Sequence, residues 1–105
     1  MPHKTIVIRR LIRTGERCPS QWEATTEDGL YLYVRYRWGC LEIGMGPSMH
    51  DAIENSGNVF EKQLGDNLDG SMDLEGLREA TSRLIAWPIT YEDRAYEGGP
   101  PGSKF

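Results

Sequence analysis

The sequence predicts an α+β fold: an antiparallel meander of four to five strands, packed on one face by one main C-terminal helix, plus a short helix. Three observations predict it. Residues 30–38 alternate apolar and polar side chains with the period of a strand. The strand-like segments around them are joined by connections too short for parallel crossovers. Residues 74–86 carry apolar side chains at helical spacing.

Length and composition indicate one domain. A chain of 105 residues with 38% hydrophobic residues suffices for one core. We expect a single α+β domain over residues 1–91 and a flexible tail over residues 92–105, where residues 98–102 (Gly-Gly-Pro-Pro-Gly) have no core-forming pattern. No apolar run approaches the roughly 20 residues of a membrane span, and no secretory signal is present. We therefore expect a cytoplasmic protein, without membrane contact, in which Cys18 and Cys40 are reduced.

Residues 4–13 predict the first strand, in which isoleucines recur on one side. Arg9, Arg10 and Arg13 interrupt its apolar pattern. Charged side chains are a common means of preventing an edge strand from pairing with other chains. We therefore interpret this strand as an edge of the sheet.

Two hairpins follow. Residues 21–27 alternate as a half-buried strand with Trp22 as a core anchor. Asp28-Gly29 predicts a tight turn, because glycine tolerates the positive φ that such turns need. Residues 41–45 resume the alternation after a second short turn, which makes them the fourth strand.

The central strand, residues 30–38, has two different faces. Its predicted core face carries Leu30, Leu32, Val34, Tyr36 and Trp38. Its other face carries Tyr31, Tyr33, Arg35 and Arg37. Glutamates on the neighbouring strands are placed to oppose the two arginines, and such cross-strand pairs contribute about 0.2 to 1 kcal/mol each. The candidate glutamates are Glu23, Glu27 and Glu42.

The short helix is predicted to begin after Ser48, which is a favourable N-cap, and to end at Gly57. Residues 58–64 fit neither the helical nor the strand period cleanly, and we interpret them as an edge strand.

The main helix is predicted over residues 74–86. Asp73 is its N-cap, and Trp87-Pro88 ends it, because proline disfavours helical geometry in the residue before it. Residues 89–91 are expected to return to the sheet as a short extended piece. The predicted core comprises Ile6, Ile8, Trp22, Leu30, Leu32, Val34, Tyr36, Trp38, Leu41, Ile43, Leu77, Leu84 and Ile85.

No catalytic, metal or cofactor site is predicted. Cys40 and His50 are the only cysteine and histidine pairing of interest, and a cysteine at a hairpin turn lacks the cationic surroundings that produce a thiolate. The cysteines and histidines also lack the short paired spacings of zinc sites. Residues 65–73 resemble a calcium loop only out of register, because its first and twelfth positions are Gly65 and Gly76. We therefore expect a protein that is not an enzyme.

The charge is unevenly distributed along the chain. Residues 1–40 carry a net charge of +3 and residues 41–105 a net charge of −7. The sequence therefore predicts a non-enzymatic protein-binding module whose acidic half docks on a basic surface of a protein partner. The predicted contact residues are Asp66, Asp69, Asp73, Glu75 and Glu79, with Trp87 or Tyr91 as an aromatic anchor. The alternative interpretation is that these carboxylates are solvated surface and helix caps.

Residues 18–39 contain Cys-Pro-Ser-Gln-Trp, then Asp-Gly, then Tyr-Val-Arg-Tyr-Arg-Trp-Gly. This stretch resembles small uncharacterised proteins of bacteria and their phages, a resemblance that implies no particular activity. If the partner's basic surface normally holds nucleic acid, the acidic half would compete for it. A phage-type inhibitor of a nuclease or defence complex would act in this way.

The alternative function is binding of single-stranded nucleic acid. Aromatic rings that stack on bases, beside arginines that contact phosphates, are what sheet-based RNA readers use. The candidate residues are Tyr31, Tyr33, Arg35 and Arg37, helped by Arg9 and Arg13. The acidic total and the absence of an RNA-recognition signature oppose this alternative.

Overall fold

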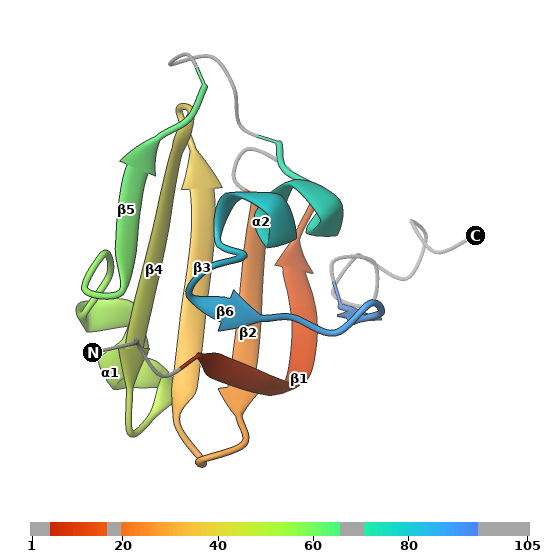
Figure 1. Cartoon of the computed structure of the whole chain (residues 1–105). Coiled ribbons are helices and arrows are strands. Elements are labelled where there is room, and N and C mark those ends of the chain that lie inside the picture. Colours follow the sequence, from red (N-terminus) through yellow and green to blue (C-terminus); the bar gives the residue numbers. More distant parts are fainter. Residues whose placement is uncertain (1–4, 17–19, 66–70, 95–105) are drawn as a thin grey trace, which may run out of the picture.

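A mostly antiparallel sheet organises the chain, as the computed structural model shows for residues 5–16, 20–65 and 71–94 (Figure 1). Its strands are β1 (Ile6–Gly15), β2 (Ser20–Thr26), β3 (Tyr31–Arg37), β4 (Cys40–Gly46), β5 (Phe60–Gln63), β6 (Ile85–Ala86) and β7 (Glu92–Asp93). The helices are α1 (Met49–Glu54) and α2 (Leu74–Ala80). Within the described part of the chain the sheet has seven strands in the order β5-β4-β3-β2-β1-β6, with β7 also paired to β1. The α+β class is confirmed.

Strands β1 to β5 form the predicted antiparallel meander. In its centre Trp22, Val34 and Ile43 lie side by side on neighbouring strands. Gly29 has a φ of 85°, as the predicted turn between β2 and β3 requires. The segment that fitted neither period, residues 58–64, contains the edge strand β5.

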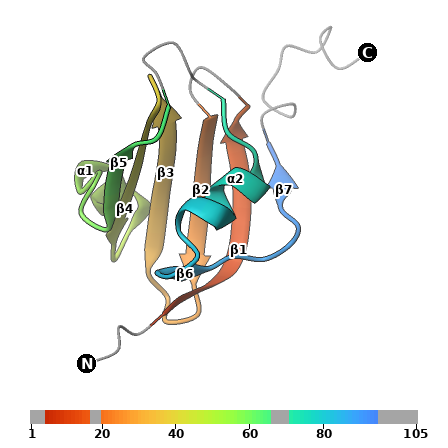
Figure 2. The ribbon, with the colours of Figure 1, turned by 45° about the horizontal axis from the view of Figure 1, so that its top comes forward.

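The sheet is larger than the predicted four to five strands. β6 and β7 both pair in parallel with β1, and Ile6 N donates to Leu84 O at 2.9 Å. The interpretation of β1 as an edge strand is therefore wrong, because β1 has neighbours on both sides. Figure 2 shows α2, β6 and β7 gathered beside β1. The sequence predicted a return to the sheet at residues 89–91, but the paired residues are Ile85–Ala86 and Glu92–Asp93. These strands are only two residues long and have no alternation to detect.

Helix α2 is shorter than predicted and ends at Ala80 rather than at residue 86. Asp73 is its N-cap, as expected. At its C-terminus, Thr81 Oγ1 donates to Leu77 O at 2.8 Å and accepts from Trp87 Nε1 at 2.7 Å. These bonds fix a turn that returns the chain to the sheet, where Ile85 joins β6. Pairing with β1 thus overrides the helical spacing of residues 81–86.

The two helices lie on opposite faces of the sheet. α2 packs on the core face, where Leu77 is fully buried. α1, capped by Ser48 as predicted, lies against the other face of β4. A Cβ atom added to Gly44 would collide with the carbonyl oxygen of Ala52, so only glycine permits this close approach. The main helix thus covers one face of the sheet as predicted, and the short helix, which the sequence did not place, covers part of the other (Figure 1).

The core confirms most of the predicted residues. The central cluster comprises Ile8, Leu11, Trp22, Ala24, Leu32, Val34, Tyr36, Leu41, Ile43, Leu74, Leu77, Ile85 and Trp87. Ile6 and Leu84 pack against it while partly exposed, and Leu30 is half-buried. Trp38 is the clear error, because it is 61% exposed. Its φ of 55° and that of Gly39, 75°, form the turn between β3 and β4 and direct its side chain away from the core.

The paired structure extends beyond residue 91, where the sequence places the start of a flexible tail. Glu92 and Asp93 form β7, and residues 95–105 lie outside the described part of the chain. Among the described residues, no helix has the length and apolar character needed to cross a membrane.

Candidate functional site

Only some of the predicted acidic contact residues are described and exposed without another structural role. Asp66 and Asp69 lie outside the described residues. The side chain of Asp73 accepts from Gly76 N at 2.8 Å and thereby caps α2. For Asp73, the alternative interpretation as a helix cap is therefore confirmed.

Glu75 and Glu79 are exposed on α2, as a contact role requires. They border a shallow groove of about 490 Å³ between α2 and β6. Arg78 lies between them in sequence and borders the same groove, so the net charge there is only −1. The full lining is Glu75, Arg78, Glu79, Ser82, Ile85, Ala86 and Trp87.

Neither predicted aromatic anchor is free. Trp87 is a buried core residue that donates its indole N–H to Thr81. Tyr91 packs edge-on against Trp22, with ring centroids 4.8 Å apart and an interplanar angle of 82°. Both rings therefore serve internal packing before they serve a partner.

The predicted nucleic-acid face exists, but one of its two arginines, Arg35, is neutralised by a carboxylate of the chain. Tyr31, Tyr33, Arg35 and Arg37 alternate on the face of β3 opposite to the core. Arg35 Nη2 donates to Glu42 Oε1 at 2.9 Å, which confirms one of the predicted cross-strand pairs. Burial raises the pKa of Tyr33, so its hydroxyl stays neutral at physiological pH. α1 covers the adjoining part of β4 and narrows the accessible sheet.

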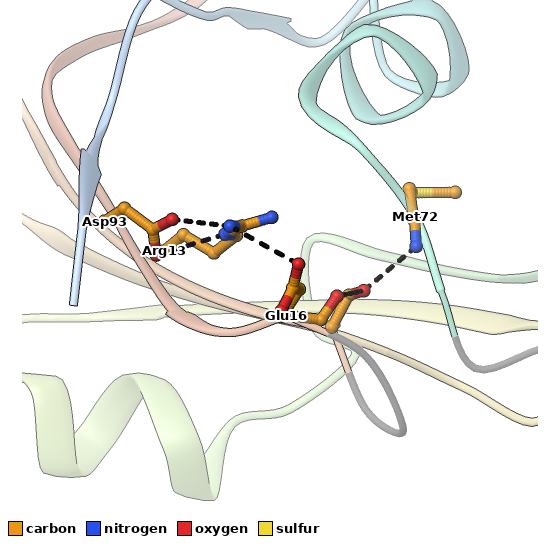
Figure 3. A network of polar contacts seen from close by, with 5 residues as sticks. Arg13, Glu16, Met72 and Asp93 are labelled. Atoms are coloured by element: carbon orange, nitrogen blue, oxygen red, sulfur yellow. Dashed lines mark hydrogen bonds and ion pairs between the residues drawn. The ribbon is translucent and has the colours of Figure 1, made fainter. Parts of the chain in front are cut away.

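Two of the three arginines of β1 also have carboxylate partners. Arg9 is exposed at an irregularity of the β1–β2 ladder. Arg10 pairs with Glu92, and Arg13 pairs with Asp93. Figure 3 shows Arg13 between the carboxylates of Asp93 and Glu16. The arginines at positions 10, 13 and 35 are thus committed to carboxylates of the chain itself.

The turn between β3 and β4 carries a feature that the sequence analysis missed. We call Arg37, Trp38 and Leu64 the hairpin tip. The guanidinium of Arg37 lies 4.1 Å from the centroid of the exposed Trp38 ring. Leu64 is 41% exposed, and its N–H donates to Gly39 O at 2.7 Å. The hairpin tip therefore presents apolar surface and a positive charge together.

The hairpin tip is held rigidly by the adjacent strand. Gln63 Nε2 donates to Trp38 O and to Gly65 O, each at 2.7 Å. Arg37 has no ion pair with any carboxylate in the described ranges. The signal that identifies this site is the two-residue connection, Trp38-Gly39, because type I′ turns, which are favoured at that length, need positive φ at both residues.

Cys40 is a half-buried free thiol. Burial, followed by the charges of Glu42 and Glu61, raises its pKa, so the unreactive protonated form dominates at neutral pH. The described residues contain no group of three or more histidine, cysteine, aspartate or glutamate side chains that would hold a metal ion.

No protein-family model matches this chain, and neither a search of curated proteins nor a search of solved structures finds a similar protein.

Proposed function

We propose that the protein is a non-enzymatic protein-binding module that engages its partner through the hairpin tip. The observation that carries this proposal is the exposure of Trp38, 61%, on a backbone with a φ of 55°. Left-handed geometry in a residue other than glycine costs on the order of 1–3 kcal/mol and is found preferentially at functional sites. The turn between β3 and β4 accounts for the positive φ of Trp38 but not for the exposed indole, because asparagine, aspartate or glycine is favoured at this turn position.

The chemistry of the hairpin tip supports a protein partner. Tryptophan and arginine are the residues that most often dominate binding energy at protein interfaces. Arg37 stacks on Trp38, and Gln63 fixes the turn, so little side-chain freedom is lost on binding. The partner surface that fits is an apolar pocket bordered by a carboxylate that pairs with Arg37.

The acidic groove beside α2 supplies a second, electrostatic contact in this proposal. Glu75 and Glu79 are exposed there and free of any capping role. They would speed association with a partner that carries basic residues opposite this groove. The prediction that such a partner belongs to a nucleic-acid-handling or defence complex, inhibited by a phage-type protein, stays a prediction.

The test compares capture of proteins from the native host by the full-length chain and two variants. Trp38→Asn removes the indole and keeps a residue that tolerates positive φ. Ile89→Ser is the matched control, because Ile89 is 78% exposed and lies outside the hairpin tip. A partner that is retained by Ile89→Ser and lost with Trp38→Asn supports the proposal. A partner bound equally by both variants refutes a contact through the hairpin tip.

A second variant separates the electrostatic contact from the aromatic one. Glu75→Lys with Glu79→Lys is expected to slow association with the captured partner and to reduce its salt dependence, while binding through Trp38 persists. Association kinetics measured at two ionic strengths provide the readout. Unchanged kinetics would remove the groove from the interface and leave the hairpin tip as the contact.

Nucleic-acid binding remains the second candidate because Arg37 lies unpaired, among the described residues, beside an exposed indole. Stacking on such a ring contributes about 1–3 kcal/mol per base in single-strand binders. The ion pairs of Arg13 and Arg35 count against it. The test measures binding of a labelled single-stranded oligonucleotide at low ionic strength. Salt-sensitive binding that is lost with Arg37→Ser favours nucleic-acid binding, and the absence of binding to the unmodified chain rules it out.

A further inference from the structure

The outer edge of β1 is occupied by a segment from much later in the chain, Tyr91–Arg94, which we call the C-terminal strap. Within it, Glu92 lies beside Ile12 and Asp93 beside Arg13, in parallel orientation. Arg94 N donates to Arg13 O at 2.8 Å. Figure 2 shows β7 as a separate short strand along β1.

Two arginines hold the strap from both faces. Arg10 donates to Glu92 through Nε and Nη2, the latter at 2.8 Å from Oε1. Arg13 donates to Asp93 through Nη2 and, at 3.2 Å, through Nε (Figure 3). Because successive side chains of a strand point to opposite faces, each arginine captures one of two adjacent carboxylates. Bidentate pairs of this kind give geometric selectivity for carboxylates.

The residue before the two carboxylates is also recognised. The ring centroid of Tyr91 lies 5.4 Å from the guanidinium of Arg13, and the same ring packs edge-on against Trp22. The edge of β1 therefore recognises three consecutive features of an extended segment: an aromatic ring, a first carboxylate and a second carboxylate.

The contacts of the strap with β1 are limited enough that another extended segment could replace it. Its ladder with β1 is only two residues long, and the side chains of Arg10 and Glu92 are 50% and 51% exposed. The residues that lead into it, Ile89 and Thr90, are exposed. Strand β6 pairs with β1 only at Ile6 and Val7, so the outer edge between β6 and β7 has no strand partner among the described residues.

We propose that this edge of β1 is a binding site for an extended acidic segment of a partner protein, and that the strap occupies it in the free protein. The segment has the chemistry of the strap, an aromatic residue followed by two carboxylates, and runs parallel to β1. The two arginines complement the charge of such a segment, and the strap is itself an example of the ligand bound at the site. This site is separate from the hairpin tip and stands without the function proposed there.

The experiment uses the full-length chain with Glu92→Lys and Asp93→Lys, which repels the strap from the two arginines. The probe is a labelled peptide, Ile-Thr-Tyr-Glu-Asp-Arg, identical to residues 89–94. We expect saturable binding at least tenfold tighter than to the unmodified chain, because the tethered strap competes at a high effective concentration. Binding should weaken as salt rises. The control peptide carries Gln-Asn in place of Glu-Asp and should not bind.

Adding Arg13→Ser to the strap variant should abolish binding of the peptide. Circular dichroism and a thermal melt check that the variants fold; if Glu92→Lys with Asp93→Lys does not, the neutral pair Glu92→Gln with Asp93→Asn replaces it with the same expectations. Equal binding to the variant and the unmodified chain, equal binding of the Gln-Asn peptide, or indifference to Arg13→Ser each overturns the proposal. Dimerisation of the chain in place of peptide binding, detected by size exclusion, overturns it in favour of strap exchange between copies.

Discussion

At the scale of single residues, a substitution of Trp38 tests whether its backbone strain or its side-chain packing has the larger effect on stability. A buried tryptophan replaced by a small residue costs about 3–5 kcal/mol of stability. Trp38 is exposed and has a positive φ, so Trp38→Asn loses little packing and relieves backbone strain. We expect its free energy of unfolding to stay within about 1 kcal/mol of the unmodified protein or to rise. Chemical denaturation measures this, with Trp22→Asn as the destabilised comparison. A loss of several kcal/mol for Trp38→Asn would show that the indole is part of the core.

The pair of Arg10 and Glu92 gives a prediction with a defined sign. The hydrogen bond from Arg10, more than its charge, lowers the pKa of Glu92. Because the carboxyl pKa is lowered in the folded state, the pair stabilises the fold fully at pH values above the ordinary glutamate pKa. This stabilisation is lost as the pH falls through the lowered pKa. In Arg10→Ser the Glu92 carboxyl should titrate at higher pH, as followed by NMR. Arg9→Ser, a change at the neighbouring exposed arginine, should leave the titration where it is; an equal shift in both variants would contradict the assigned pair.

At the scale of elements, the docking of α1 on β4 depends on one missing side chain. A Cβ atom on Gly44 would meet backbone atoms of Ala52 and Asn55, which cannot move aside without shifting α1. Gly44→Ala should therefore destabilise the protein by about 1–3 kcal/mol, the usual cost of overpacking. Thermal melts measure the change, with Glu61→Ala on the exposed face of β5 as control. An unchanged midpoint would show that α1 is free to adjust its position.

The helices and strands also show which structural features local sequence patterns can predict. The alternation around Leu32 and Val34, the Gly29 turn and the Ser48 and Asp73 caps are local signals, and the structure contains each of them. The end of α2 is different. Residues 81–86 keep a helical spacing, but the N–H groups of Leu84 and Ile85 both donate to Thr81 O, and Leu84 O accepts from Ile6 N of β1.

The candidate sites were only partly predictable for the same reason. The seat of Glu92 is determined by Arg10, which lies 82 residues earlier in the chain, and no local pattern records such a pairing. Trp38 was misplaced because its alternation fits the strand, whereas the two-residue turn determines its backbone. The pairing of Arg35 with Glu42 was predictable because a short hairpin places the two side chains opposite one another.

At the scale of the whole molecule, β5 forms one edge of the sheet within the described part of the chain, and its Glu61 and Lys62 are exposed. When two copies of an antiparallel edge pair about a two-fold axis normal to the sheet, residues of the same face meet. Pairing centred on this strand therefore opposes Glu61 to its own copy, or Lys62 to its own copy, and like charges directly opposite are unfavourable. Glu61→Thr with Lys62→Thr should increase self-association. Static light scattering over a range of protein concentrations measures this. Glu75→Thr, on α2, is the control; equal behaviour of the two variants would show that β5 charges do not protect this edge.

On the other side of the sheet, β1 is synthesised long before the strands β6 and β7 that pair with it. Its contacts with β7 span 80 to 82 residues of sequence, so a ribosome that adds about 5–20 residues per second leaves the outer edge of β1 uncovered for on the order of 4–16 seconds. An uncovered strand edge is a template for pairing with other nascent chains. During this interval the positive charges of Arg9, Arg10 and Arg13 lie along that edge. The arginines that later hold the strap thus protect the growing chain from aggregation before the strap has been synthesised.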